Sequence, residues 1–367
     1  MRFLCGMVLC YLFVWMSWVF ANDHHIRDVE DRTHAVSLSV EPLRAHHLQS
    51  FVLDAQAITL LQESSPLHAQ AKEQLLKDAA SATRLEIKDE RFQETPDFLA
   101  PFIHVNTLWI KQMNATHLPN LPRKDHLIHL SASDLCLKSL SQLAGYPNLQ
   151  KCILTRIVLD DNTNKADEPQ EPSPFLAPLT TLCNLRELFL IQTLDLRGDH
   201  KAHEALFVTM MQNNTHLKKL VLSGHISDAV CVAIAQASLD ELLLTDSQLD
   251  DRQLALLPLS TLKALILTYG HLKAIEPLRA AGLHTLGLSA VGLHDIPDFD
   301  TAFAEILCTM TNLKKLILYG DDLRDVHVEP LLALTSQLDS LALGGCPHLS
   351  AHVRQKLDET FKDKIFL

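Results

Sequence analysis

The sequence predicts an α/β solenoid, in which short repeats stack side by side and share one parallel sheet. Two observations support this fold class. The octamer LKKLVLSG at Leu217 returns almost unchanged as LKKLILYG at Leu313, and its apolar pattern recurs along most of the chain. Segments with helical periodicity separate several of the copies. Each strand is therefore expected to return through a helix on the opposite side of the array.

The repeat pattern is LxxLxL, usually followed by another apolar residue four or five positions later. Copies begin at 48, 82, 105, 125, 149, 185, 217, 239, 262, 283, 313 and 338, and most intervals lie between 20 and 25 residues. With this motif at this spacing, the chain resembles the leucine-rich repeat superfamily over about residues 48–350. The resemblance implies a curved horseshoe with a parallel sheet on the concave side and mainly helical segments on the convex side. It says little about function, because the superfamily is defined by its core.

The apolar positions of each copy are expected to point into one core. The first residue turns inward and the next two alternate along a short strand, so a single repeat cannot bury its apolar face without neighbours. In the copy at 125, Ile128 and Leu130 are assigned as the inward pair, which puts His129 between them. Asp125 occupies the first slot of this copy, and the copies at 105 and 82 match the pattern loosely.

Four return segments are predicted to be helical. Ser65 and Pro66 form an N-cap and first-turn pair ahead of residues 67–80, and Ser227 and Asp228 precede residues 229–237. Residues 200–212 and 298–310 complete the set. The long interval from 149 to 185 has another cause, an acidic, proline-rich loop at 160–174. We interpret this loop as a solvated insertion, with contact to a partner as the alternative.

The ends of the chain have their own assignments. Residues 1–21 are predicted to be a signal peptide, because the apolar run from Phe3 to Phe20 is followed by Ala21 and a polar segment. An uncleaved anchor is the alternative, since a run of this length can just span a bilayer. Residues 22–47 are expected to form an N-terminal cap segment, 48–349 the repeats, and 350–367 a C-terminal capping helix.

The composition and the absence of catalytic motifs argue against several classes of function. The formal charge of −12 argues against nucleic acid as a partner, because phosphate contacts need a basic face. The sequence contains no GxSxG, HExxH, phosphate-binding loop or glycine-rich dinucleotide turn, so we expect no enzyme and no cofactor. The six cysteines after residue 21 lack metal-ligand spacing, and we expect most to be small buried hydrophobes, with one or two disulfides as the alternative.

Three smaller hypotheses concern histidine, glycosylation and metal. The 20 histidines suggest an acid-responsive surface, against the simpler explanation of compositional drift. Asn114 and Asn213 begin N-x-Thr sequons, which are candidate glycosylation sites or chance matches. No metal site is expected; cleavage after Ala21 would leave His24 third in the chain, an arrangement that suits Cu(II) or Ni(II), but functional use is not expected.

The residue between the last two inward positions of each copy should face out of the concave sheet. In most copies this residue is apolar, although an ordinary solvated face would be polar. We interpret the row as a surface for a protein or peptide ligand. The alternative is the β-propensity of branched residues, which favours them on either face. The candidate partner-binding residues are Trp109, His129, Ile153, Phe189, Val221, Leu243, Ile266 and Ile317, with Tyr319 beside the row.

The sequence thus predicts a non-catalytic protein-binding scaffold that is secreted, or periplasmic if bacterial, and is not attached to a membrane once the signal peptide is cleaved. The alternative is a membrane-tethered structural or adhesive surface protein held by an uncleaved N-terminal anchor.

Overall fold

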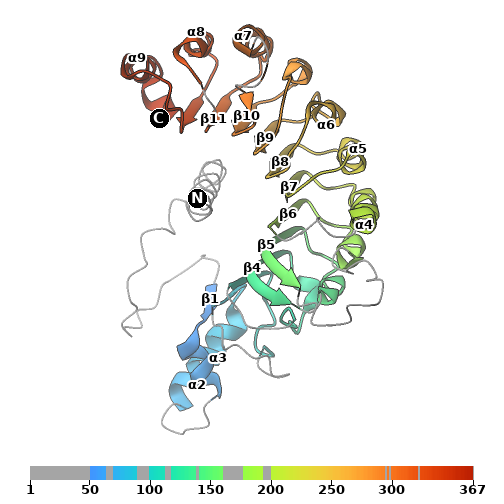
Figure 1. Ribbon diagram of the computed structural model, residues 1–367. Coiled ribbons are helices and arrows are strands. Elements are labelled where there is room, and N and C mark those ends of the chain that lie inside the picture. Colours follow the sequence, from blue (N-terminus) through green and yellow to red (C-terminus); the bar gives the residue numbers. More distant parts are fainter. Residues whose placement is uncertain are drawn as a thin grey trace. The chain divides into compact units, whose positions relative to one another are not determined.

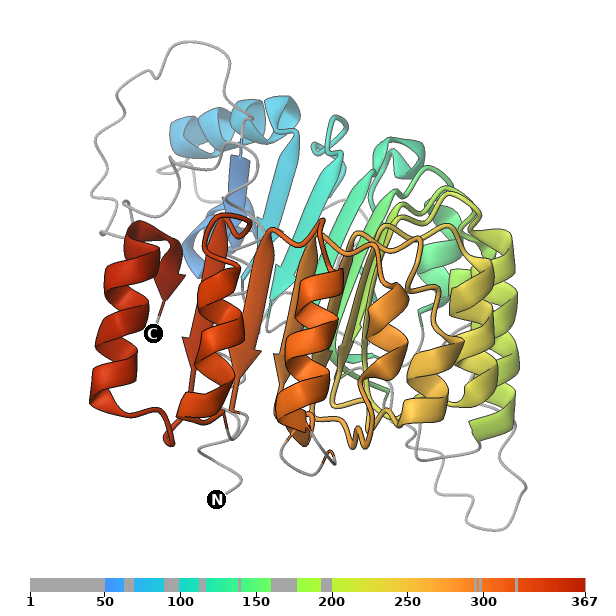
Figure 2. The same cartoon turned by 90° about the horizontal axis from the view of Figure 1, so that it is seen from above.

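The computed structural model describes residues 50–62, 69–88, 99–111, 117–137, 140–159, 177–192, 200–293, 296, 299–320 and 323–366. These residues form one open sheet in which every strand pairs in parallel with the next strand in the chain. The sheet curves, and the helices lie along its outer, convex side (Figures 1 and 2). This is the architecture of a leucine-rich repeat solenoid, as the sequence predicted.

The sheet contains 13 strands, in the order in which they occur in the sequence. Their bounds are β1 (Ser50–Leu53), β2 (Arg84–Ile87), β3 (Thr107–Lys111), β4 (His129–Leu137), β5 (Lys151–Leu159), β6 (Glu187–Ile191), β7 (Lys219–Ser223), β8 (Glu241–Thr245), β9 (Ala264–Thr268), β10 (Thr285–Ser289), β11 (Lys315–Tyr319), β12 (Ser340–Gly344) and β13 (Ile365–Phe366).

The convex side combines α-helices with shorter 3-10 helices. The α-helices are α2 (Ala55–Gln62), α3 (Ala69–Ser81), α4 (His200–Asn213), α5 (Asp228–Gln236), α6 (Asp251–Leu256), α7 (Phe299–Thr309), α8 (Val328–Ala333) and α9 (Ala351–Phe361). The 3-10 helices are η2 (Lys124–His126), η3 (Ser141–Gly145), η4 (Ala177–Thr181), η5 (Glu276–Ala280), η7 (Asp325–His327) and η8 (Lys362–Lys364). The repeats closed by η3 and η5 are short, and a 3-10 turn reverses the chain in fewer residues than an α-helix.

All four predicted helices are present. Helices α4, α5 and α7 match the predicted ranges, and Ser227 caps α5 by accepting a hydrogen bond from the Val230 backbone N–H. Helix α3 begins at Ala69, and its predicted cap at Ser65 and Pro66 lies outside the described residues, as does the acidic loop at 160–174. The C-terminal prediction needs a correction. Helix α9 ends at Phe361, and the chain then adds β13 to the edge of β12.

The core lies between the sheet and the convex segments. The second and fourth residues of each five-residue strand are buried in it, as in β7, where Leu220 and Leu222 point inward. The first, third and fifth residues face the concave side. Backbone pairing is in register throughout, so equivalent residues of successive repeats form continuous rows across the sheet.

A residue with positive φ recurs at the same place in nine successive repeats, within β4 and β5 and just after the strand in the other seven. It stands four residues after the second inward residue each time, and glycine fills the place only at 224, 320 and 345. The others are Asp134, Arg156, Gln192, Asp246, Tyr269 and Ala290, all with φ between 48° and 57°. For residues with a Cβ this conformation costs about 1–2 kcal/mol. The turn from the sheet to the convex side thus imposes strain at six positions.

Gln253 connects two repeats through the convex side. Its backbone N–H donates to the Asp250 side chain and its own side chain accepts from the Asp250 N–H, which closes a capping box at the start of α6. The side-chain NH₂ group of Gln253 donates to the carbonyl oxygen of Ile226 in the preceding repeat, at 2.6 Å. One buried amide therefore satisfies backbone groups in both repeats.

We predict that Gln253→Ala lowers the free energy of unfolding by about 2–3 kcal/mol, because it removes the capping box and leaves the Ile226 carbonyl without its partner. Urea denaturation measures the change. Gln236→Ala, at an exposed position at the end of α5, is the control and should stay within about 0.5 kcal/mol of the wild type. Equal effects of the two substitutions would contradict the role of Gln253.

The left-handed turns generate a second prediction. Ala290→Gly should raise the free energy of unfolding by about 0.5–1 kcal/mol, because glycine adopts the positive φ without the Cβ clash. The same substitution at exposed Ala280 in η5 should lower it by a similar amount, because there glycine only adds freedom to the unfolded chain. Destabilisation by both substitutions would show that the turn at 290 carries no strain.

Candidate functional site

The concave face contains the residues that the sequence singled out. Trp109, Ile153, Phe189 and Val221 occupy the third position of consecutive strands, from β3 to β7, with Ser131 between the first two. Leu243, Ile266 and Ile317 continue this row, which we call the middle row, and Tyr319 lies at the fifth position of β11. The fold thus puts these apolar side chains on one face, opposite the core.

The predicted repeat register around His129 was wrong by two residues. The inward residues of this repeat are Leu127, Leu130 and Ala132, and Ser131 pairs with Trp109 in the middle row. His129 instead opens β4, between Thr107 and Lys151. It still faces the concave side, in the row of first strand positions. The small Ala132 in a leucine slot made the alternative pairing of Ile128 with Leu130 fit the pattern better.

Curvature closes part of the middle row to solvent. A Cβ built on Gly287 would lie 3.4 Å from the Cβ of Ile266, whereas neighbouring strands are about 4.8 Å apart in an uncurved sheet. Val221 and Ile266 are each only 1% exposed, and Leu243 and Ile317 are 5% exposed. These side chains offer a partner little surface. Trp109, Ile153, Phe189 and Tyr319 remain partly exposed.

Trp109 lies in a group of charged side chains near the N-terminal end of the sheet. The Arg84 guanidinium stacks on the Trp109 ring at 3.5 Å from its centroid, and the Lys111 ammonium lies 5.9 Å away. The carboxylate of Glu86 pairs with Lys88 at 3.0 Å and with Lys111 at 3.9 Å. Arg84 has no carboxylate partner among the described residues, so cationic charge is in excess around this ring.

Phe189 lies between two lysines that are themselves paired. Lys151 and Lys219, in the flanking strands, approach the ring centroid at 5.5 and 5.7 Å. Lys151 pairs with Glu187 at 2.6 Å, and Lys219 pairs with Glu241 at 2.7 Å. The ion pairs hold the ammonium groups beside the ring, so Phe189 presents an apolar surface with a charged border. Such an anchor is typical of protein interfaces.

The neighbours of His129 act on its protonation. Partial burial lowers the pKa of His129, the positive charge of Lys151 lowers it further, and Glu187 acts in the opposite direction. The histidine is thus held toward its neutral form, in which it both donates and accepts hydrogen bonds.

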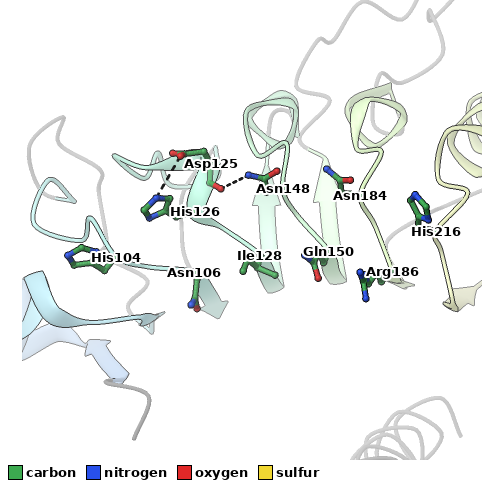
Figure 3. A pocket seen from close by; sticks show the side chains of 10 residues that line it. All are labelled: His104, Asn106, Asp125, His126, Ile128, Asn148, Gln150, Asn184, Arg186 and His216. Atoms are coloured by element: carbon green, nitrogen blue, oxygen red, sulfur yellow. Dashed lines mark hydrogen bonds and ion pairs between the residues drawn. The ribbon is translucent and has the colours of Figure 1, made fainter. Parts of the chain in front are cut away.

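A polar groove lies at the edge of the sheet where strands β3 to β7 begin (Figure 3). It has a volume of about 660 Å³ and is formed by the residues just before and just after the first inward residue of five successive repeats. We call it the rim groove. Its lining comprises His104, Asn106, Asp125, His126, Ile128, Asn148, Gln150, Asn184, Arg186 and His216.

The leucine pattern of the sequence does not predict the rim groove. Its signal is the set of tripeptides HVN, HLI, NLQ, NLR and HLK at 104, 126, 148, 184 and 216, in which all the residues that flank the inward residue are polar except Ile128. The LxxLxL motif does not specify these flanking residues.

Only half of the six cysteines are buried, although most were expected to be. Cys152, Cys231 and Cys346 are buried, whereas Cys136, Cys183 and Cys308 are exposed, and all six are free thiols. Burial raises the pKa of Cys152 and of Cys231 to about 12, which keeps both thiols protonated and inert.

Of the candidate glycosylation and metal residues, only Asn213 belongs to the described part of the chain. Asn114 and His24 lie outside it, while Asn213 ends α4 and donates its side-chain N–H to the Thr180 carbonyl oxygen at 2.8 Å. Within the described ranges, no group of three or more histidine, cysteine, aspartate or glutamate side chains could hold a metal ion. In that same part of the chain, no helix is both long and apolar enough to cross a membrane.

No family model matches the chain, and no curated protein is similar to it. Solved structures with a similar fold include an internalin, InlF, from Listeria monocytogenes, at 17% identity and a TM-score of 0.39, covering 80% of this chain and 69% of that one. Mouse RP105 in complex with MD-1 matches at 15% identity and a TM-score of 0.46, covering 80% of this chain and 56% of that one.

TLR13 in complex with ssRNA13 matches at 17% identity and a TM-score of 0.48, covering 76% of this chain and 43% of that one. At these values the likeness concerns the fold alone, and the strand order and register of this chain establish that fold. The expectation that this chain does not bind nucleic acid therefore rests on its net charge.

The surroundings of His129 lead to a prediction. Lys151→Gln should raise the pKa of His129, because it removes a nearby positive charge and releases Glu187 from its ion pair. Titration of the His129 imidazole by NMR measures the shift. Lys263→Gln, in a distant repeat, should leave it unchanged. An unchanged or lowered pKa in Lys151→Gln would contradict the assigned interaction.

Proposed function

We propose that this protein is a secreted, non-catalytic scaffold that binds a protein or peptide partner on its concave face. Trp109, His129, Ile153, Phe189 and Tyr319 form the accessible contact surface. Val221, Leu243, Ile266 and Ile317 lie under or beside it and fix its shape. The proposal includes no cofactor, no catalytic step and no nucleic acid.

The environment of Phe189 carries this proposal. A partly exposed aromatic ring on a curved sheet, bordered by two lysine–glutamate pairs, combines an apolar anchor with a charged rim. Hot spots of protein interfaces have this composition, because the apolar centre excludes water and the rim restricts the partner. The β-propensity of branched residues does not account for a phenylalanine held between two cations.

Trp109 extends the same surface toward the N-terminal repeats. The excess of cations over carboxylates around it favours a partner segment that carries acidic side chains. Three strand spacings separate Phe189 from Trp109, about 14 Å. A peptide lying across these strands would contact both aromatic rings.

A membrane-tethered adhesive or structural protein is the second candidate. The apolar run from Phe3 to Phe20 favours it if this run is not removed. N-terminal sequencing of the protein from its native source distinguishes the two candidates. A chain that begins at or near Asn22 supports the secreted scaffold, and a chain that retains residues 1–21 supports the tethered protein.

We predict that Phe189→Asp lowers the capture of a native partner at least tenfold, because it puts a charge at the centre of the apolar contact. Trp109→Asp should act in the same direction. Pull-down from the native environment, followed by titration of the captured partner, measures the loss.

Val158→Asp is the matched control. Val158 is 59% exposed and lies on β5 beyond the left-handed residue Arg156, outside the concave rows. It should leave capture within about twofold, since a surface charge away from an interface has little effect. Capture that survives Phe189→Asp, or that fails equally in Val158→Asp, would refute binding on the concave face.

A further inference from the structure

The rim groove is built from groups that the fold orients and does not fully use. Asn148 and Asn184 each donate one side-chain N–H to a carbonyl oxygen of the preceding repeat, to Asp125 at 2.8 Å and to Pro147 at 2.9 Å. Each amide keeps its oxygen and a second N–H. Because the bond to the preceding repeat holds the side chain in place, binding a ligand costs little additional side-chain entropy.

Other lining groups make no side-chain hydrogen bond or ion pair within the described residues. These are His104, Gln150, Arg186 and His216. Gln150 and Arg186 follow the first inward residue of adjacent repeats, so their side chains leave the sheet side by side (Figure 3). Asp125 differs, because Arg123 already pairs with it at 3.3 Å. The groove therefore offers neutral hydrogen-bonding groups and one unpaired cation, Arg186.

The backbone along the groove is already satisfied. The carbonyl oxygen of Gln150 accepts hydrogen bonds from the N–H groups of Arg186 and Glu187, and the carbonyl of Arg186 accepts from Lys218 and Lys219. An extended peptide cannot add to this edge as a strand. Ile128 is the one apolar side chain in the lining, so the groove also lacks the apolar pockets that select peptide side chains.

We propose that the rim groove binds an acidic oligosaccharide, with its hydroxyl groups on the amide and imidazole side chains and one carboxylate on Arg186. Hydroxyl groups both donate and accept, which matches side chains that do the same. Arg186 holds the carboxylate through charge-assisted hydrogen bonds, which are stronger than neutral ones. The groove spans four strand spacings, about 19 Å, which suits a short chain of sugar units. This site is separate from the proposed concave surface and does not depend on it.

The test uses the full chain and three uronate probes, short oligomers of galacturonate, of mannuronate and of hyaluronan. Calorimetric titration should detect saturable binding of at least one. Its neutral methyl ester should bind at least tenfold more weakly, because the ester removes the charge that Arg186 contacts. Binding of none of the three probes, or equal binding of acid and ester, would overturn the proposal.

Two variants locate the site. Arg186→Gln and Gln150→Glu should each weaken the uronate at least tenfold, the first by removing the cation and the second by adding a repelling charge beside it. Arg186 is exposed, Gln150 is half-buried, and neither side chain makes a hydrogen bond or ion pair within the described residues, so thermal unfolding should be unchanged. Lys263→Gln is the control; Lys263 occupies the same repeat position as Arg186 but pairs with Asp240 at 3.0 Å. It should leave binding within twofold.

The remaining outcomes also decide the question. An oligoglutamate peptide that binds in the groove more tightly than every uronate probe would replace the sugar with an acidic peptide and overturn the assignment. Phe189→Asp should leave uronate binding unchanged, so loss of partner capture and loss of sugar binding are independent results. A uronate that binds equally to Arg186→Gln and to the unsubstituted protein would place it elsewhere on the molecule and refute the rim groove.

Discussion

The in-register parallel pairing of the strands is the constraint on which the rest of the structure depends. Each backbone carbonyl at the start of a strand accepts two N–H groups from the next repeat, as Asn106 does from Ile128 and His129. This pairing allows no slip of one residue, because a slip would turn every leucine from the core to the solvent. Equivalent positions of successive repeats therefore form rows, and every surface of the solenoid is assembled from such rows.

Curvature then determines which rows can bind anything. It brings the side chains of the concave face closer together than in an uncurved sheet, and several of the large residues pair with a small one. Trp109 pairs with Ser131, Ile266 with Gly287 and Tyr319 with Gly344. A Cβ on Gly344 would lie 2.3 Å from the Tyr319 ring, so the aromatic side chain occupies the space that glycine leaves. A small neighbour makes room for a large side chain but does not by itself expose it, since Ile266 beside Gly287 is only 1% exposed.

The sequence alone predicted most of the fold, because leucine slots and strand spacing follow directly from burial. Eleven of the twelve repeat registers agree with the strand pairing. The exception is the repeat around His129. There Ala132 occupies the inward position that leucine fills in other repeats, and a small alanine is not recognised in a pattern of large apolar residues. An inward position must be apolar because it is buried, but it need not carry a large side chain.

The candidate sites were harder to predict from the sequence than the fold. An outward position can be named from the repeat, but its exposure depends on the curvature and on the size of its neighbours. Val221 and Phe189 occupy equivalent slots, yet one is nearly closed to solvent and the other is not. The rim groove depends on polar side chains that converge only after five repeats are stacked.

Contact of a partner with the accessible aromatic residues of the concave face can be measured by hydroxyl-radical footprinting of the protein, with and without a partner captured from its native environment. If a partner binds there, Trp109 and Phe189 lose reactivity in the complex, while Val158 and Val326, both 59% exposed, keep theirs. Unchanged reactivity at Trp109 and Phe189, with protection at Val158 or Val326, would contradict this contact.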